Sequence, residues 1–219
     1  MMFAESSPAT ETRSEGRVRP STSPKTYRAT LAIPTTPEEA SNLLTRVERI
    51  VDKGRVTNEL LLDLARFLGA NSAAWTPVNR ARLRRALAGF DGTAVVDAIV
   101  AMIQSHPRTD ILDEAELALR GLAPHSASRM RRLVLEPGLD AGVRVCILRA
   151  AARLDTSGSA ESVRLALSDP ETELRDAAIA LLAELALPTG RAWLQQRLDR
   201  ESSAMVQDAI RDALASFPR

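Results

Sequence analysis

The chain has 219 residues, of which 45% are hydrophobic and only 3% aromatic, so its core must be built from aliphatic side chains. Lysine and arginine number 29 against 28 aspartate and glutamate, so no net field draws the whole chain to nucleic acid or an anionic membrane. The single cysteine, Cys146, excludes an intrachain disulfide and a cysteine-cluster metal site, and it fits a reducing compartment.

The start of the chain lacks both the basic region and the apolar stretch of a secretory signal, and no later run approaches the ~18 apolar residues of a membrane span. We therefore expect a cytoplasmic protein that makes no membrane contact. Only Lys25 and Lys53 among the cations are lysines, a bias that we attribute to a GC-rich, bacterial genome.

Residues 1–35 are rich in serine, threonine, proline and arginine and show no apolar periodicity. Such a segment cannot bury enough apolar surface to offset its ordering entropy, so we expect a disordered N-terminal arm. A solvated tail and a short linear motif with modification sites are both open interpretations. The arm carries five cations and three acids, namely Arg13, Arg17, Arg19, Lys25 and Arg28 against Glu5, Glu11 and Glu15.

Residues 36–76 predict an N-terminal helical hairpin. Thr36 is expected to cap the first helix, with Pro37 at its first position and Glu39 completing a capping box. Gly54 ends this helix. The second helix is expected to stop at Gly69 in the left-handed conformation that commonly follows a helix.

Residues 77–219 contain a repeat of about 32 residues. The last apolar residues of successive long helices, Phe90, Leu122, Leu154, Leu185 and Phe217, are separated by 32, 32, 31 and 32. The shorter helix of each unit repeats too, in one column of Ile99, Met130, Val163 and Leu194 and a second of Ile103, Val134, Leu167 and Leu198. A hairpin this small cannot bury its apolar face alone, so neighbours must stack on it. We expect an all-α fold, a right-handed α-solenoid of about six hairpins over residues 36–219.

Two units carry a recognisable pattern. Asp140-Ala141-Gly142-Val143-Arg144 precedes an alanine-rich stretch ending at Leu154, and residues 169–175 repeat the pattern. This resembles the HEAT-like repeats of the phycobilisome-lyase type over about residues 77–217. The flanking units fit less closely, with Leu112-Asp113 and Val206-Gln207 in place of the hydrophobic-arginine pair. The resemblance implies an armadillo-like helical fold and most often an adaptor role, although the family also contains bilin lyases, a di-iron hydroxylase and DNA glycosylases.

Residues that would carry catalysis are scarce. His106 precedes Pro107 and His125 precedes Ser126, so the His-Glu pairs of the di-iron branch are missing. Cys146 shares a helical face with apolar residues, which predicts a core thiol and not a nucleophile. Trp75 and Trp193 lie too far apart in sequence for us to map a glycosylase base pocket. We expect no catalytic residue, no metal site and no cofactor.

The residues after the first short-helix column stack on the surface of the short helices, which line the concave side in most HEAT-like arrays. We therefore predict a partner-binding stripe there, with guanidinium groups contacting carboxylates of a protein partner. Arg144 and Arg175 are instead expected to pair with Asp140 and Glu171, four residues earlier. The stripe comprises Arg131, Arg132, Arg164, Gln195 and Gln196.

Two arginine-rich segments leave a rival interpretation open. They are the clusters at 80–85 and 129–132, in which the alternative contacts to an anion are Arg80, Arg82, Arg84, Arg85 and Arg129. The leading hypothesis is a non-catalytic scaffold or adaptor that binds a protein partner. The alternative is a nucleic-acid-binding helical-repeat protein, and a bilin-lyase-type enzyme ranks last. The partner's identity and the oligomeric state stay open.

Overall fold

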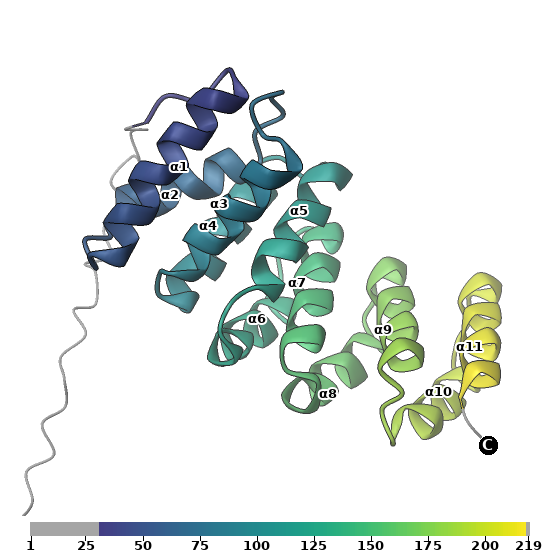
Figure 1. The fold of residues 1–219 in the computed structure, drawn as a ribbon. Helices are drawn as coiled ribbons and strands as arrows, with labels where there is room; N and C mark the ends of the chain where they lie inside the picture. Colours follow the sequence, from purple (N-terminus) through teal and green to yellow (C-terminus); the bar gives the residue numbers. More distant parts are fainter. Residues whose placement is uncertain (1–30, 218–219) are drawn as a thin grey trace, which may run out of the picture.

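The computed structural model describes residues 31–217, and over that range it contains helices and no strand (Figure 1). Residues 1–30 of the N-terminal arm predicted from the sequence lie outside the described residues. The helices are α1 (Pro37–Asp52), α2 (Asn58–Leu68), α3 (Pro77–Ala88), α4 (Gly92–Ser105), α5 (Thr109–Arg120), α6 (Ala127–Val134), α7 (Ala141–Leu154), α8 (Thr156–Ala166), α9 (Thr172–Leu185), α10 (Gly190–Leu198) and α11 (Ala204–Ser216).

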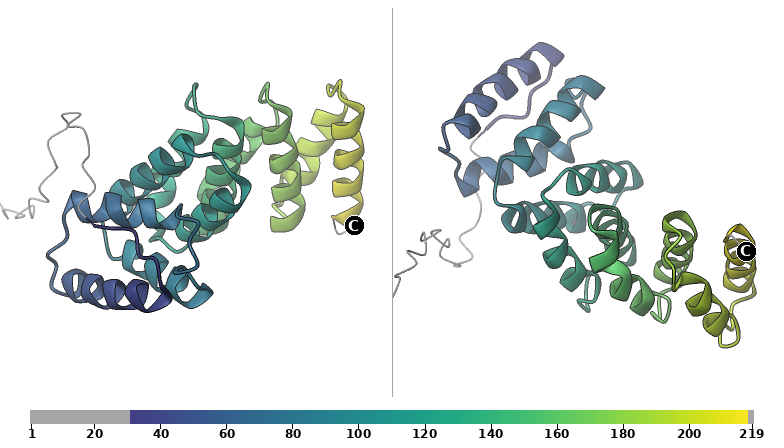
Figure 2. Two further views of the ribbon diagram at one scale, coloured as in Figure 1. Left: turned by 90° about the horizontal axis from the view of Figure 1, so that it is seen from above. Right: turned by 60° about the horizontal axis from the view of Figure 1, so that its bottom comes forward.

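Successive helices form antiparallel hairpins that stack along one direction (Figures 1 and 2). The first helices of the hairpins, α1, α3, α5, α7 and α9, pack side by side in one layer that α11 continues, and the second helices form the other layer. The all-α solenoid predicted from the repeat is confirmed. Within residues 31–217 it consists of five hairpins and α11, which stands alone in the place of a sixth.

The start of α1 forms as its sequence predicts. The Thr36 hydroxyl accepts a hydrogen bond from the Glu39 backbone N–H, and the Glu39 carboxylate accepts one from the Thr36 backbone N–H, which completes the capping box. Gly54 has the positive φ of +64° expected after the helix. The left-handed stop predicted at Gly69 is wrong, because its φ is −81°. A Cβ there would come within 2.6 Å of the Met102 sulfur, so a larger residue would force the Met102 side chain on α4 to move.

Residues 31–35, which the sequence assigns to the arm, instead contact the solenoid. The Leu31 backbone N–H donates to the buried Asp63 carboxylate over 2.9 Å, and its carbonyl accepts from Arg66. Pro34 is buried and its carbonyl accepts from the Ser72 hydroxyl. Because backbone groups of this segment find partners on and just beyond α2, residues 31–35 belong to the folded array.

The core is aliphatic, as the composition requires. Ile99, Met130, Val163 and Leu194, which form the first short-helix column, are at most 1% exposed. The exception to the aliphatic core lies near its N-terminal end, where Phe67 and Trp75 stack with ring centroids 5.5 Å apart. Trp75 is therefore a core residue that closes the first hairpin.

Arginines at the starts of the long helices connect consecutive units. Arg144 on α7 pairs with Asp169, and Arg175 on α9 pairs with Glu201, in each case an acid in the loop before the next long helix. The predicted pairs with Asp140 and Glu171 are therefore wrong. Asp140 instead caps α7 by accepting from the Gly142 backbone N–H over 2.9 Å.

The equivalent positions in the flanking units hold other residues. Ile111 is buried, as Val143 is, so the upstream counterpart of Val143-Arg144 is Ile111-Leu112. The pair expected from the sequence pattern, Leu112-Asp113, lies one residue later. At the far end Gln207 takes the place of the arginine and donates to the Glu201 carbonyl. Arginine bridges of this type therefore occur where α7 meets α9 and where α9 meets α11.

Glu201 is the most enclosed of these acids, with a side chain that is 0% exposed. Burial alone would raise its pKa, but a hydrogen bond from the Ser203 N–H and the guanidinium groups of Arg197 and Arg175 together lower the pKa to about 2. Glu201 is thus ionised at neutral pH and holds two arginines in place. This arrangement makes the α9–α11 contact dependent on one carboxylate.

We expect Glu201→Gln to lower the free energy of unfolding at pH 7 by roughly 3 kcal/mol, because it leaves the buried Arg175 without its counter-charge. Urea denaturation measures this loss. A depressed pKa stabilises the fold above the unfolded-state value of about 4.3 and loses this effect as pH falls toward 2. The difference between wild type and variant should therefore shrink over that range.

Glu161→Gln is the matched control, since it removes an exposed acid that pairs with exposed Arg164. Its stability should stay close to that of wild type. A Glu201→Gln effect that is equally large at pH 7 and pH 2.5 would show that the carboxylate charge is not its cause.

Candidate interaction surface

The predicted short-helix stripe is placed on three consecutive short helices, as expected. Arg131 and Arg132 lie on α6, Arg164 on α8, and Gln195 and Gln196 on α10, and all except the half-buried Arg131 are exposed. Two of its arginines already have carboxylate partners. Arg131 pairs with Asp155, the N-cap of α8, over 2.8 Å, and Arg164 pairs with Glu161 over 2.6 Å.

The bend of the array does not favour this stripe. In the view of Figure 1 the hairpins curve toward the side of the long helices, so the short helices lie on the outer side of the bend. The physical reason is that neighbouring long helices pack closely from α5 to α11, whereas neighbouring short helices make fewer contacts. The expectation that the short helices line the inner side therefore does not hold in this chain.

One small hollow nevertheless connects two members of the stripe. It has a volume of about 80 Å³ and lies between α8 and α10. Arg164 and Gln196 line it, together with Trp193 and the arginines Arg197 and Arg200. Arg197 is held by Glu201. The hollow has room for little more than a side-chain tip.

The arginine clusters are largely engaged within the array. Arg80 donates to the carbonyls of Leu68 and Ala70 at the end of α2. Arg82 on α3 forms a two-pronged pair with Glu48 on α1, at 2.9 and 2.7 Å.

Other members of the clusters bind acids of neighbouring helices. Arg84 pairs with Glu114 on α5, and Arg129 on α6 pairs with Asp97 on α4 over 2.7 Å. Arg85 is exposed. Because most of these guanidinium groups connect helices, phosphate contacts would have to displace existing partners.

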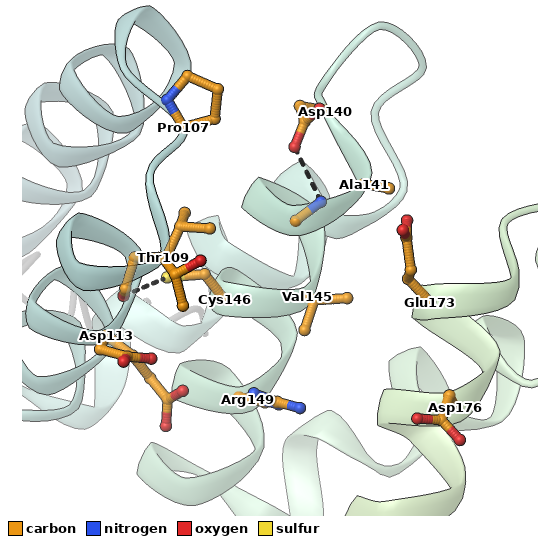
Figure 3. Close-up of a pocket in the computed structure, with 13 residues that line it drawn as sticks. Pro107, Thr109, Asp113, Asp140, Ala141, Val145, Cys146, Arg149, Glu173 and Asp176 are labelled. Carbon is orange, nitrogen blue, oxygen red and sulfur yellow. Dashed lines mark hydrogen bonds between the residues drawn. The ribbon is translucent and has the colours of Figure 1, made fainter.

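A larger groove lies on the opposite face, over α5, α7 and α9, and has a volume of about 450 Å³ (Figure 3). We call it the long-helix groove. Its lining comprises Pro107, Thr109, Leu112, Asp113, Glu116, Asp140, Ala141, Gly142, Val145, Cys146, Arg149, Glu173 and Asp176.

The floor of the long-helix groove belongs mainly to α7 and combines small and apolar residues with Arg149. Val145 and Cys146 lie between the two rims (Figure 3). The Cys146 thiol donates to the Leu112 carbonyl over 3.4 Å. Burial, followed by the nearby Glu116 charge, raises the pKa of Cys146 to about 12, so the thiol is protonated at neutral pH. Cys146 is a core residue, as its helical face predicts.

The rims of the long-helix groove are acidic. Asp113 lies on the α5 side, and Glu173 and Asp176 lie on the α9 side (Figure 3). These three side chains are exposed and form no ion pair with any described residue. Glu116 is compensated by Arg153 over 2.6 Å, and Arg149 is the only cation among the lining residues. The groove therefore has an excess of negative charge.

Our sequence reasoning missed this surface, although its signal is present. Ile111, Val143, Leu174 and Val206 are buried at one register of the long helices. Two residues later stand Asp113, Val145, Asp176 and Asp208, at steps of 32, 31 and 32. The buried columns define the repeat, whereas this exposed column, in which three of four residues are aspartate, marks the groove.

The residues considered for metal chemistry lie apart from one another. His106 ends α4 and His125 lies in the short turn before α6. Within residues 31–217 no group of three histidine, cysteine, aspartate or glutamate side chains is placed to hold a metal ion. Over the same residues, no helix combines the length and the apolar character that crossing a membrane requires.

Comparison with known proteins gives remote similarity only. No protein-family model matches the chain, and no curated protein matches it. A computationally designed armadillo repeat protein for modular peptide recognition is similar over 83% of this chain and 94% of its own, with 14% identity and a TM-score of 0.38. A designed armadillo repeat protein in complex with the peptide (KR)4 is similar over 83% and 91%, with 13% identity and the same TM-score. At these values the likeness supports no conclusion about a partner.

Because the Cys146 thiol is buried and protonated, we expect it to be alkylated slowly. At pH 8 a thiol with a pKa of about 12 is ionised at roughly one part in ten thousand, against about a quarter for an ordinary cysteine. We expect iodoacetamide to react with Cys146 at least about 100-fold more slowly in the native protein than in urea, as measured by mass spectrometry. Similar rates in the two states would show that the thiol is accessible and readily ionised.

Proposed function

We propose that this chain is a non-catalytic protein-interaction scaffold that holds a partner segment in the long-helix groove. The observation that carries the proposal is the groove itself, in which exposed acids on two helices flank small and apolar floor residues on a third. A groove of this kind combines area for apolar contact with charges that orient a ligand. The helical-repeat build supplies the extended surface that such proteins use for binding.

Exposed apolar side chains on the same face support the proposal. Val78 on α3 and Met205 on α11 are 69% and 68% exposed, and Leu117 on α5 is 47% exposed. Val78 and Met205 occupy equivalent positions of the first and last repeats. The column that joins them is Val78, Asp110, Gly142, Glu173 and Met205, with steps of 32, 32, 31 and 32. Apolar contacts for a partner are thus available on either side of the groove.

An enzyme of the bilin-lyase type is the weaker proposal. It rests on the resemblance of residues 140–154 and 169–175 to HEAT-like repeats of that family, and fold resemblance alone carries little weight for activity. The one thiol in the groove is also a poor nucleophile, because its pKa is raised to about 12. We therefore propose a role without catalysis.

The short-helix stripe is a second proposed contact surface. Arg132 and Gln195 are exposed, and no hydrogen bond engages either side chain within the described residues. Contacts to a partner's carboxylates or to nucleic-acid phosphates would use these residues first. A cytoplasmic location, inferred from the lone cysteine, stays a prediction.

The two surfaces can be separated by capture experiments with the full chain as bait in native lysate, with and without nuclease. The groove variant, Asp113→Asn with Glu173→Gln and Asp176→Asn, should lose a discrete, nuclease-resistant protein that wild type retains. These side chains pair with no described residue, so thermal unfolding should be unchanged. The readout is quantitative mass spectrometry of the captured proteins.

A charge-matched control neutralises three exposed acids outside the groove, Glu59→Gln with Glu136→Gln and Asp199→Asn, and should capture as wild type does. A stripe variant, Arg132→Ser with Arg164→Ser, tests the second surface. Loss of the partner in the stripe variant alone would reject the groove as the contact surface. Recovery of nuclease-sensitive material only would favour nucleic-acid binding.

A further inference from the structure

The charge of the long-helix groove is not balanced by its surroundings. Arg144 is committed to Asp169, and Arg153 lies between Glu116 and Glu184. Both arginines are at most 21% exposed and serve contacts within the array. Asp113, Glu173 and Asp176 form no ion pair with a described residue, and Arg149 on α7 is the one cation among the lining residues (Figure 3). One guanidinium cannot balance three carboxylates, so a ligand that supplies further cations gains attraction.

The negative charge continues along the face beyond the groove. On α11, Asp208 and Asp212 are exposed, and Asp208 occupies the register of Asp113 and Asp176. Asp208 forms an ion pair with Arg211 over 2.5 Å, whereas Asp212 forms no ion pair with a described residue. An extended ligand that crosses the groove toward α11 therefore meets acids at successive helices.

The floor limits what can lie between the acids. Leu112, Val145 and the buried Cys146 present apolar surface, and Ala141 and Gly142 are small. Arg149 lies one helical turn further along α7, between Asp113 and Asp176 (Figure 3). An added Cβ on Gly142 would approach the Asp140 carboxylate and the Leu112 side chain at 3.2 and 3.4 Å, so a larger residue would fit only tightly there. The groove is therefore suited to a chain that places an apolar side chain on α7 and polar ends on the rims.

The helix spacing sets the spacing of the ligand's charges. Neighbouring packed helices lie about 8–10 Å apart, so α5 and α9 are separated by about 16–20 Å. An extended chain advances about 3.3 Å per residue, and alternate side chains point to one side. Cationic side chains about six residues apart, with an apolar side chain between them on the same side, match Asp113 on one rim and Asp176 on the other.

We propose that the long-helix groove binds an extended, cationic segment of a partner protein, with lysine or arginine side chains on Asp113 and on Glu173 and Asp176. This inference rests on the proposed scaffold function and names the chemistry of its partner. The apolar residues of the floor favour a peptide over a free cation. The negative rims disfavour nucleic acid and acidic segments on this face.

The experiment uses the full chain and a dye-labelled peptide that has two arginines six residues apart, a leucine between them on the same side, and serines elsewhere. Fluorescence anisotropy should show binding to wild type that weakens as salt is raised. The groove variant should bind at least about tenfold more weakly. The control variant with neutralised Glu59, Glu136 and Asp199 should bind as wild type does.

Two further probes test the assignment. A peptide with glutamates in place of the arginines should not bind. A full-chain variant with the arm cations Arg13, Arg17, Arg19, Lys25 and Arg28 changed to serine should bind the cationic peptide as wild type does. Much tighter binding by that variant would identify the chain's own arm as the occupant and overturn the assignment to a partner.

Equal binding of the cationic peptide to wild type and the groove variant would also overturn the proposal. The capture experiment then separates the two levels of inference. If the groove variant still loses its captured protein, the groove is the contact surface and only the cationic chemistry is wrong. If capture too is unaffected by the groove variant, the proposed function fails with it.

Discussion

The structure depends on the fact that no hairpin of this chain can cover its own apolar surface. Each long helix from α3 to α9 packs against the long helix before it and the one after it, so neighbouring units have to meet in a defined register. Arginines at the starts of α7 and α9 contribute to that register. Arg144 and Arg175 both reach forward to an acid in the loop before the next long helix. A partly buried guanidinium without that acid would be costly, so stacking in another register is disfavoured.

This use of arginine also shapes the outer surface. The chain as a whole has a formal net charge of +1, which suggests no strong preference for ligands of either sign. Many of its arginines, however, form ion pairs between helices, as Arg82 and Arg153 illustrate. The acids that face outward from α5 and α9 are left in excess, so an almost neutral chain carries a locally negative groove. Local charge, and not net charge, is what a ligand meets within a Debye length.

Much of the architecture could be predicted from sequence because it rests on local signals. The capping box of Thr36 and Glu39 and the spacing of buried aliphatic residues specify where helices start and which face is buried. The arginine pairs could not be predicted in the same way. Asp140, four residues away, and Asp169, 25 residues away, compete for Arg144. Which acid pairs with the arginine depends on how two hairpins pack. Asp140 is unavailable to Arg144 because it caps its own helix.

The candidate site was missed for a different reason. Its elements are periodic, but the periodicity lies in exposed residues, which pattern reading treats as solvated surface. The depth of the groove comes from small residues on α7, where Gly142 stands at the register that Asp110 holds on α5 and Glu173 on α9. Its charge comes from the neighbouring helices. Because depth and charge reside on different repeats, the same solenoid can carry a groove of another charge with an unchanged floor, and the exposed register positions therefore set the charge of the groove.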